Sequence, residues 1–333
     1  MAQQKIVTVT GASGFVGRHV VRELLTRGFS VRALVRDRAK AAQALPPRAA
    51  GTSIEIIVGE ALDPRDARAA CAGADACIHL VGILREHPRD GVTFQRAHVD
   101  ATRNVLAACR DAGVGRFLHM SALGVCDDGV CGYQRTKWAA EQLVRDSSLD
   151  WTIFRPGLIH GEGSHFMDVA EGLVSGHEMP WFFMPYFTRG VADPSVPMGG
   201  DTVIDPLVAP VLVTDVARAF VAALNNERAI GETYNLVGSE TLSWPDMLRF
   251  IRDTLPGGND RLEPFGVPSK LAALKFQAMN LVGLGDMLPF DDGMALMGGQ
   301  DATATLDKAS EHLGVTFAPF RTAMRAYAPA ETH

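Results

Sequence analysis

The chain lacks the features that mark several protein classes. It has no run of about 18 apolar residues, so we expect no segment that spans a bilayer. Only 6 of its 32 basic residues are lysines, and no basic block offsets the net charge of −6, which argues against a nucleic-acid partner. Residues 1–4 lead directly into an apolar strand, without the basic and then apolar stretch of a leader peptide. These absences predict a cytoplasmic protein.

Cysteine is also scarce, with five residues at the scattered positions 71, 77, 109, 126 and 131. An odd and irregular set predicts a reducing compartment and no disulfide framework. Cys126 and Cys131 alone make no zinc site, so we interpret them as ordinary thiols. His160, Glu162 and His165 lie in a glycine-rich run, whereas a zinc-binding HExxH motif needs a helix to bring its histidines together. We therefore predict a polar loop there and no metal site.

What the chain does contain is a repeated alternation of strand and helix patterns. Helical spacing of apolar residues follows the first strand and ends at Gly28, and a second helical pattern covers 93–113. Strands alternating with helices predict right-handed crossovers and a parallel sheet covered on both faces. The first predicted strand, 5–10, is rich in β-branched residues, and the further predicted strands are 30–35, 54–58, 76–81 and 116–120.

A glycine-rich turn, TVTGASGFVG, joins the first strand to the first helix. Gly11, Gly14 and Gly17 let the backbone turn tightly and approach a ligand closely, and the helix N-terminus offers free N–H groups and a partial positive charge. Three glycines at this spacing are weak evidence alone, but at the start of a strand–helix–strand unit they are specific. The turn therefore predicts a site for the pyrophosphate of a dinucleotide.

The residue after the second strand indicates which dinucleotide is bound. An acidic residue there accepts from both ribose hydroxyls of NAD, whereas an arginine pairs with the 2′-phosphate of NADP. This chain has Arg36, and a charge-assisted hydrogen bond of ~1.5–3 kcal/mol corresponds to roughly 10- to 100-fold in affinity. Asp37 follows at once and could turn inward instead. We favour NADP(H) over NAD(H), with a solvated loop cation as the alternative for Arg36.

Ser121, Tyr133 and Lys137 suggest a proton-transfer site. Ser121 follows the fifth predicted strand, and the other two lie one helical turn apart on one face. A tyrosine that moves a proton at neutral pH must lower its pKa by about 3 units, or ~4 kcal/mol. A lysine ~5 Å away supplies ~3 kcal/mol at an effective dielectric near 20, so a cationic nicotinamide would have to supply the rest. The alternative is an exposed ion pair between Lys137 and Glu141.

The pattern changes near Trp151. Residues 151–156 predict a sixth strand, and the next fifty are rich in glycine, proline and aromatic residues. Residues 208–226 predict a short strand and a helix capped by Thr214 or Asp215, and 232–238 a last strand. We therefore predict an α/β, doubly wound parallel sheet in a dinucleotide-binding domain of residues 1–156, with returning segments at about 203–237. A smaller, mostly helical substrate or partner lobe would take 157–202 and 238–333.

Together these motifs resemble the extended and atypical short-chain dehydrogenases/reductases, which have a Rossmann sheet. The resemblance rests on TGASGFVG at 10–17, Ser121 before YQRTK, RPG at 155–157 and VTDVARAF at 213–220. Within that superfamily, three segments are similar to the branch containing the nucleotide-binding accessory subunit of respiratory complex I and its bacterial relatives: HLVGILRE (79–86), FLHMSALG (117–124) and YQRTKWAAE (133–141). A less specific similarity runs from 287–299 to 312–315.

The resemblance implies roles for individual residues. Ser121 would position the substrate, Tyr133 would act as acid or base, and Lys137 would hold the nicotinamide ribose. The chain departs from the family at His98, where many relatives have asparagine, and in a short Ser-to-Tyr loop, which argues against a nucleotide-sugar substrate. Glu60 and Ala61 stand where relatives carry an acidic and a hydrophobic residue near the adenine. The implied cofactor-binding residues are Gly11, Ser13, Gly14, Phe15, Val16, Gly17, Arg36, Glu60, Ala61, Leu80, Val81, Gly82, Lys137 and Pro156.

An aromatic segment, MPWFFMPYF at 179–187, bears on the substrate. It predicts either a hydrophobic plug in the second lobe or an apolar surface for a lipophilic substrate, a membrane face or a protein partner. We favour an NADP(H)-dependent oxidoreductase acting on a small carbonyl or alcohol. The alternatives are a non-catalytic NADP(H)-binding protein of a respiratory complex, at the inner face of the membrane, and an NAD-dependent epimerase or dehydratase.

Overall fold

A computed structural model describes residues 5–47, 51–192, 195, 201–281, 283, 288 and 290–328 of the chain. Residues 1–4 and part of the segment 287–299 lie outside the described residues. The chain forms two compact units. The first comprises Met1–Pro156, Val213–Leu236 and Thr305–Phe317, and the second Gly157–Leu212, Val237–Ala304 and Ala318–His333. Residues 305–317, which the sequence places in the lobe, thus pack within the first unit.

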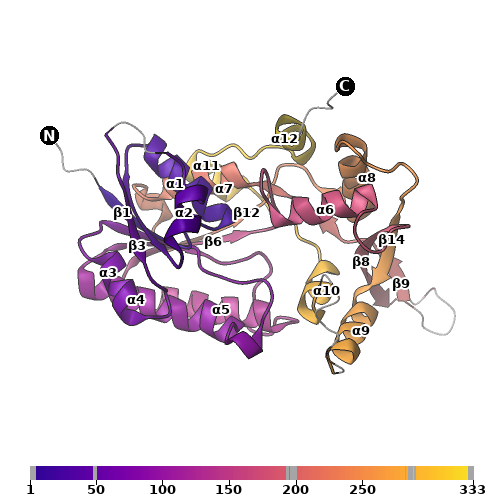
Figure 1. Ribbon diagram of the computed structural model, residues 1–333, viewed down its shortest axis with the longest axis horizontal. Coiled ribbons are helices and arrows are strands. Elements are labelled where there is room, and N and C mark those ends of the chain that lie inside the picture. The colour runs from indigo at the N-terminus through magenta and orange to yellow at the C-terminus, as the bar shows by residue number, and fades with distance from the viewer. Residues whose placement is uncertain are drawn as a thin grey trace. The chain divides into compact units, whose positions relative to one another are not determined.

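The first unit contains a seven-stranded sheet in the order β12-β6-β5-β4-β1-β2-β3 (Figure 1). Every pair of neighbours runs parallel, which confirms the predicted α/β, doubly wound Rossmann class. The crossovers are too long for hairpins, as parallel strands require. The strands are β1 (Ile6–Thr10), β2 (Ser30–Val35), β3 (Ile54–Val58), β4 (Ala76–His79), β5 (Arg116–Met120), β6 (Asp150–Pro156) and β12 (Glu232–Leu236).

Helices cover both faces of this sheet. In Figure 1, α1, α2 and α7 lie on one side and α3, α4 and α5 on the other. A π-helical turn, η2 (Gln95–Asp100), leads directly into α4. The helices are α1 (Phe15–Thr26), α2 (Arg38–Ala44), α3 (Pro64–Cys71), α4 (Ala101–Ala112), α5 (Gly132–Arg145), α7 (Val213–Ala223) and α11 (Asp307–Leu313), with short 3₁₀ turns at η1 (Pro88–Asp90) and η3 (Glu227–Ala229).

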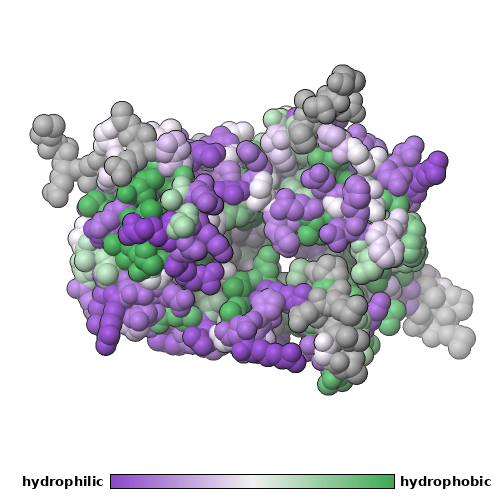
Figure 2. All heavy atoms as spheres, in the orientation of Figure 1, coloured by the Kyte–Doolittle hydropathy of each residue, from purple (hydrophilic) through white to green (hydrophobic). Residues whose placement is uncertain are grey.

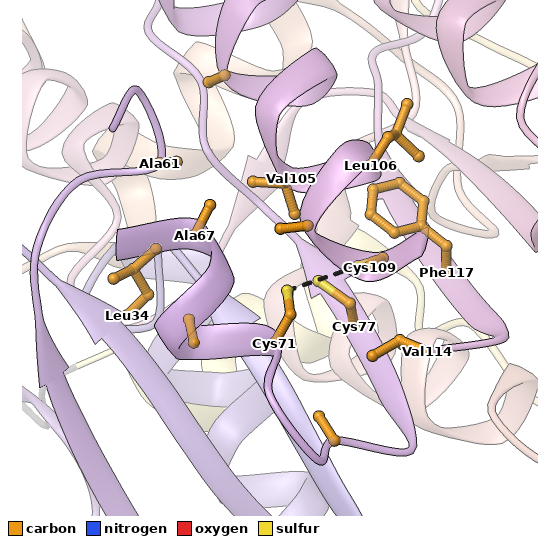
Figure 3. Packing of buried hydrophobic residues seen from close by; sticks show 14 of the residues in the cluster. Leu34, Ala61, Ala67, Cys71, Cys77, Val105, Leu106, Cys109, Val114 and Phe117 are labelled. Atoms are coloured by element: carbon orange, nitrogen blue, oxygen red, sulfur yellow. Dashed lines mark hydrogen bonds between the residues drawn. The ribbon is translucent and has the colours of Figure 1, made fainter. Parts of the chain in front are cut away.

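A hydrophobic cluster fills the space between the sheet and the helices α3, α4 and α5 (Figure 3). Phe117 and Ile153 contribute from the strands and Val105 from α4, and all three are fully buried. Each such side chain contributes roughly 1.5–3 kcal/mol through burial. The same packing fixes where the strand ends lie.

The strand order reverses between β1 and β4, because the chain builds outward from β1 in both directions. In open parallel sheets, ligands bind beyond the carboxyl ends of the strands at such a switch point. The loop after β1 holds Gly11 and Gly14, Gly17 lies in the first turn of α1, and the loop after β4 begins with Leu80. The topology therefore places these two predicted cofactor-binding segments at the same edge of the sheet.

The second unit combines helices with small sheets. Its three-stranded sheet has the order β14-β8-β9, and its core includes Met184, Met247, Ile251 and Phe320. Within the described residues after 238, where the sequence predicts mostly helices, the structure has five helices. One of them, α11, packs in the first unit. The elements are β7 (Ile159–His160), α6 (His165–Ser175), β8 (Met184–Ala192), β9 (Asp201–Ile204), β10 (Leu207–Val208), β11 (Val211–Leu212), β13 (Leu242–Ser243), α8 (Trp244–Thr254), β14 (Pro264–Pro268), α9 (Ser269–Leu281), α10 (Asp292–Gly298) and α12 (Phe320–Tyr327).

The aromatic segment 179–187 serves two purposes in this unit. Met184 is fully buried in the core, whereas Trp181 and Phe182 are 59% and 71% exposed. Phe265 of β14 is exposed beside them, in contact with Phe183. Figure 2 shows hydrophobic surface over β8 and β14 at the right of the view. The predicted hydrophobic plug therefore describes Met184, and Trp181 and Phe182 form an exposed apolar surface. Among the described residues, no helix has the length and apolar character needed to cross a bilayer.

Candidate nucleotide-binding and catalytic site

The glycine turn has the close packing that its glycines predict. Gly11 has a φ of +72°, and its carbonyl accepts a hydrogen bond from the N–H of Gly14 at 3.0 Å. A Cβ on Gly11 would lie 3.2 Å from the carbonyl carbon of Leu80, and a Cβ on Gly17 would lie 2.1 Å from the oxygen of Gly11. The turn, the first helix and the end of β4 thus pack so closely that side chains are excluded at Gly11 and Gly17.

The N-terminus of α1 is free to receive an anion. Its N-cap is Gly14, which has no side chain to bond the first N–H groups, and no acidic residue lies in the first turn. Ser13 and Phe15 are half-buried and Val16 is buried, so the turn packs against the rest of the first unit. Exposed N–H groups and the helix dipole suit a pyrophosphate. The residues present therefore fit the phosphates of a dinucleotide.

Arg36 and Asp37 follow β2 with separate tasks. The carboxylate of Asp37 caps α2 by accepting from the N–H groups of Ala39 and Lys40 at 2.8 and 3.1 Å, which lowers the pKa of Asp37. It is therefore occupied by the helix and does not turn toward a ribose. Arg36 is exposed, and no hydrogen bond or ion pair of its side chain occurs within the described part of the chain. Arg38 binds the carbonyl of Ile56 at 3.2 Å.

The remaining predicted cofactor-binding residues lie at the ends of β3, β4 and β6. Glu60 is exposed and donates its N–H to Asp66 at 2.8 Å, and Ala61 is buried in the hydrophobic cluster. Leu80 is buried and Val81 is half-buried, while Pro156 is buried at the end of β6. All of them follow strand ends at the edge where Gly11 lies.

Ser121 extends β5 by one residue. Its N–H donates to the carbonyl of Phe154 at 2.7 Å, and the N–H of Leu123 donates to Pro156 at 2.9 Å, so the loop is fixed to the end of β6. The side chain is 3% exposed, and its hydroxyl has no hydrogen-bond partner in the described structure. A buried polar group left unsatisfied costs roughly 1–3 kcal/mol. The Ser121 hydroxyl is available to bond another oxygen.

Lys137 is buried beside the same strand. It is 3% exposed, and its Nζ donates to the carbonyl of Met120 at 3.0 Å. A Cβ on Gly82 would lie 2.9 Å from this Nζ, so the glycine makes room for the ammonium group. Burial lowers the pKa of Lys137 to about 8, and Glu141 partly opposes the shift.

Glu141 is not the ion-pair partner that the simpler interpretation of Lys137 requires. It is fully buried, accepts two hydrogen bonds from Arg155 at 2.7 Å and binds Arg145 at 3.0 Å. The helix face is therefore internal, and the expected exposed Lys137–Glu141 pair is wrong. Arg155 reaches Glu141 from β6, which the i,i+4 spacing alone does not reveal.

Tyr133 lies one turn before Lys137 and is half-buried. Its ring meets those of Phe94 and His98 edge-on, with centroids 5.8 and 5.3 Å apart. Burial and the neighbouring Cys131 raise the pKa of Tyr133 above its ordinary value. This direction is opposite to the lowering expected from Lys137, whose ammonium is bound to a backbone carbonyl. The phenol is therefore protonated at neutral pH.

Three buried histidines, His79, His98 and His119, lie near Lys137, and only His98 stood out in the sequence. His98 bonds Thr136 at 2.9 Å and the backbone of Ile83, and burial, aided by Lys137, lowers its pKa to about 2. His79 and His119 are register partners on β4 and β5 with stacked rings 5.6 Å apart. Burial lowers the pKa of both, to about 3 for His79. Alternation along the two strands, which places both rings on one sheet face, was the available signal.

The histidines of the glycine-rich run 160–165 do not converge on a metal. His160 is buried and bonds the hydroxyl of Tyr327 at 2.9 Å, and burial lowers its pKa to about 4. His165 begins α6 and is exposed. Within the described residues, these side chains are not among the groups whose ligand atoms lie together.

Comparison with known proteins follows the same division. Residues 11–174 match the profile of a family described as NAD(P)H-binding. These residues thus have the sequence pattern of an NAD(P)H-binding domain. The chain is 33% identical over 158 residues to a ceramide reductase of Caulobacter vibrioides, covering 47% of each protein. It is 28% identical over 283 residues to subunit 9 of the NADH dehydrogenase [ubiquinone] 1 alpha subcomplex of Arabidopsis thaliana, covering 83% of this chain and 65% of that one.

The NAD(P)H-binding domain thus has homologues among both reductases and complex I subunits. The chain spans between about half and two thirds of the length of these curated relatives. Among solved structures, the NADPH-dependent quinone oxidoreductase QOR2 of Escherichia coli, in complex with NADPH, superposes with a TM-score of 0.65 at 20% identity. That alignment covers 96% of this chain and 99% of the other, and it supports the short-chain dehydrogenase/reductase fold.

Proposed function

We propose that the protein is an NADPH-dependent reductase that acts on the carbonyl group of a lipophilic small molecule. The observation that carries the proposal is the pair of buried polar groups at the end of β5, the unbonded hydroxyl of Ser121 and the ammonium of Lys137. Neither is required by the packing around it. Both lie at the sheet edge where parallel α/β proteins bind their ligands.

In this proposal each residue has a separate role. The glycine turn and the N-terminus of α1 hold the pyrophosphate, and Arg36 holds the 2′-phosphate because Asp37 is occupied by its helix. The dinucleotide, when bound, supplies a hydride. The Ser121 hydroxyl donates a hydrogen bond to the substrate oxygen and orients it. Tyr133 donates the proton to that oxygen, and Lys137 stabilises the negative charge that develops on the phenol.

The raised pKa keeps the phenol of Tyr133 protonated at neutral pH, so the side chain carries the proton that reduction of a carbonyl requires. The substrate class is supported by two similarities, to a ceramide reductase and to a quinone oxidoreductase.

A second candidate is a nucleotide-binding subunit without turnover, in contact with a respiratory complex. It is favoured by one observation, that the complex I relative matches 83% of the chain, whereas the ceramide reductase matches 47%. The two candidates differ in how long the nucleotide stays bound. The nucleotide that co-purifies with the protein would be identified, and its exchange against added NADPH would be timed. Exchange within seconds supports a co-substrate, and retention for hours supports the second candidate.

Replacement of one hydroxyl tests the reductase directly. Tyr133→Phe should abolish NADPH oxidation with a carbonyl substrate found by screening, while NADPH affinity stays within about twofold, because the ring still packs against Phe94 and His98. Tyr234→Phe is the matched control, since it removes a hydroxyl that bonds His312 in the same unit. Turnover by Tyr133→Phe equal to that of the control would remove Tyr133 from the mechanism.

A further inference from the structure

Three of the five cysteines, scattered in the sequence, meet in the first unit. Cys71 ends α3, Cys77 lies in β4 and Cys109 lies in the last turns of α4. All three are fully buried, and their sulfur atoms lie within 4.8 Å of one another. The sulfurs of Cys71 and Cys109 are 3.6 Å apart. Figure 3 shows the three side chains turned toward one another among apolar neighbours.

These spacings match a three-coordinate metal–sulfur centre. A metal–thiolate bond of ~2.3 Å places three sulfurs ~4.0 Å apart around a planar trigonal ion, and ~3.5 Å apart around a pyramidal ion that carries a lone pair. The observed 3.6 Å between the sulfurs of Cys71 and Cys109 lies between these values, and all three sulfurs lie within 4.8 Å of one another. A disulfide would need a sulfur separation of about 2 Å, so the thiols are in contact but not joined. The backbone therefore holds the three sulfurs at nearly the spacing that an ion would require.

We propose that Cys71, Cys77 and Cys109 form a buried three-thiol site for one thiophilic ion, and that trivalent arsenic is the ion it fits best. Soft thiolate ligands select soft ions over magnesium, calcium or manganese. Zinc prefers four ligands, and within the described residues this group offers three. The site therefore excludes the commoner structural metal by its ligand number.

Charge separates the remaining ions. The three sulfurs lie in a cluster of alanine, valine, leucine and phenylalanine side chains, where an uncompensated charge is costly. Three thiolates around a trivalent ion form a neutral centre, whereas the same thiolates around Cu(I) carry two negative charges. The guanidinium of Arg32 binds the backbone carbonyls of Ala70 and Ala72 beside Cys71, and its single charge offsets at most one of these two negative charges.

The binding step is balanced and needs no oxidant. Arsenous acid and three thiols form three As–S bonds, while three As–O and three S–H bonds break. Each hydroxide leaves with a thiol proton as water, so three waters are released and no net charge enters the core.

An entry route exists at the end of α3. Cys71 is the last helical residue, and the following Ala72 and Gly73 are exposed in a turn. A Cβ on Gly73 would meet no atom within 4 Å, so solvent lies next to the turn. Fraying of a single helical turn exposes Cys71, because helix ends open at low free-energy cost.

The decisive test leaves the cluster intact. A variant carrying Cys126→Ala and Cys131→Ala retains only the three clustered thiols. Under anaerobic, reducing conditions, both it and the wild type should bind one equivalent of arsenite, and X-ray absorption should show three sulfur neighbours. Saturation at about 100 times the dissociation constant should raise Tm by roughly 4 °C if the whole chain unfolds together.

Further arms identify the ligands and the ion. Cys71→Ala and Cys109→Ala should each weaken arsenite binding at least tenfold, whereas Cys126→Ala should not. Where a cluster variant does not fold, the double variant above still decides. Loss of binding in the double variant, two sulfur neighbours, or no binding by the wild type would overturn the site and leave the thiols as core packing. Tighter binding of Cu(I) or Zn(II) than of arsenite would overturn the choice of ion.

Discussion

Replacement of Lys137 by methionine should stabilise the protein in a pH-dependent way. Burial lowers the pKa of Lys137 from 10.5 to about 8 in the folded state. Below pH 8 the amine is charged in both states, so the full cost of burying the charge is present. Between about pH 8 and 10.5 the unfolded chain binds more protons than the folded one, and the free energy of unfolding of the wild type rises with pH. Methionine has no such dependence.

The magnitude follows from the size of the shift. One pKa unit corresponds to 1.36 kcal/mol, so the stability advantage of Lys137→Met over the wild type should be about 2.5 kcal/mol larger at pH 7 than at pH 10. Taking this difference between two pH values removes constant effects, such as the hydrogen bond lost at Met120. Urea unfolding of both proteins at several pH values measures it.

The control for this experiment is Lys270→Met, a replacement of the exposed lysine at the start of α9. Its stability relative to the wild type should not change with pH over the same range. If Lys137→Met and the wild type show parallel pH dependences, Lys137 is not buried as a charge. The proposed role of its ammonium group in the site is then refuted.

Two further predictions concern Arg36 and the glycine turn. Arg36→Ala should weaken NADPH binding about 10- to 100-fold and leave NADH unchanged, as measured by fluorescence titration, because one charge-assisted contact to the 2′-phosphate is lost. Arg27→Ala, an exposed charge removed at the end of α1, should alter neither, and equal losses of both nucleotides would refute the assignment. Gly17→Ala should destabilise the protein by about 1–3 kcal/mol in urea unfolding, because its Cβ would lie 2.1 Å from the oxygen of Gly11. Gly115→Ala, where no atom lies within 4 Å, should have little effect, and similar losses for both would contradict the steric reason.

The sequence predicted those parts of the site that depend on local chain geometry. Gly11 and Gly17 follow a strand and open a helix, and their spacing reports a backbone constraint that the structure contains. The seven strands could be predicted from the sequence because most of them are short apolar runs between helical patterns, as is typical of buried parallel strands. The position of Arg36 after β2 followed from the same strand boundaries.

What the sequence did not reveal depends on contacts between distant segments. Glu141 reads as a surface residue in α5, and only the pairing of β5 with β6 brings Arg155 to it. Cys71, Cys77 and Cys109 lie on a helix end, a strand and another helix, so no spacing rule relates them. The three sulfurs meet because α3 and α4 pack against the sheet that contains β4, and no sequence spacing encodes that packing.

The burial of Lys137 and Ser121 bears on the choice between a reductase and a nucleotide-holding subunit. A protein that only retains a dinucleotide needs the glycine turn, the free helix N-terminus and Arg36. It gains nothing from a buried serine hydroxyl without a partner, which reduces stability, whereas the buried Lys137 would serve either protein by holding the nicotinamide ribose. Destabilising polar groups that gather at one ligand-binding strand end are typical of sites that act on a substrate. The structure of the site therefore favours a reductase, even though the complex I relative aligns with more of the chain.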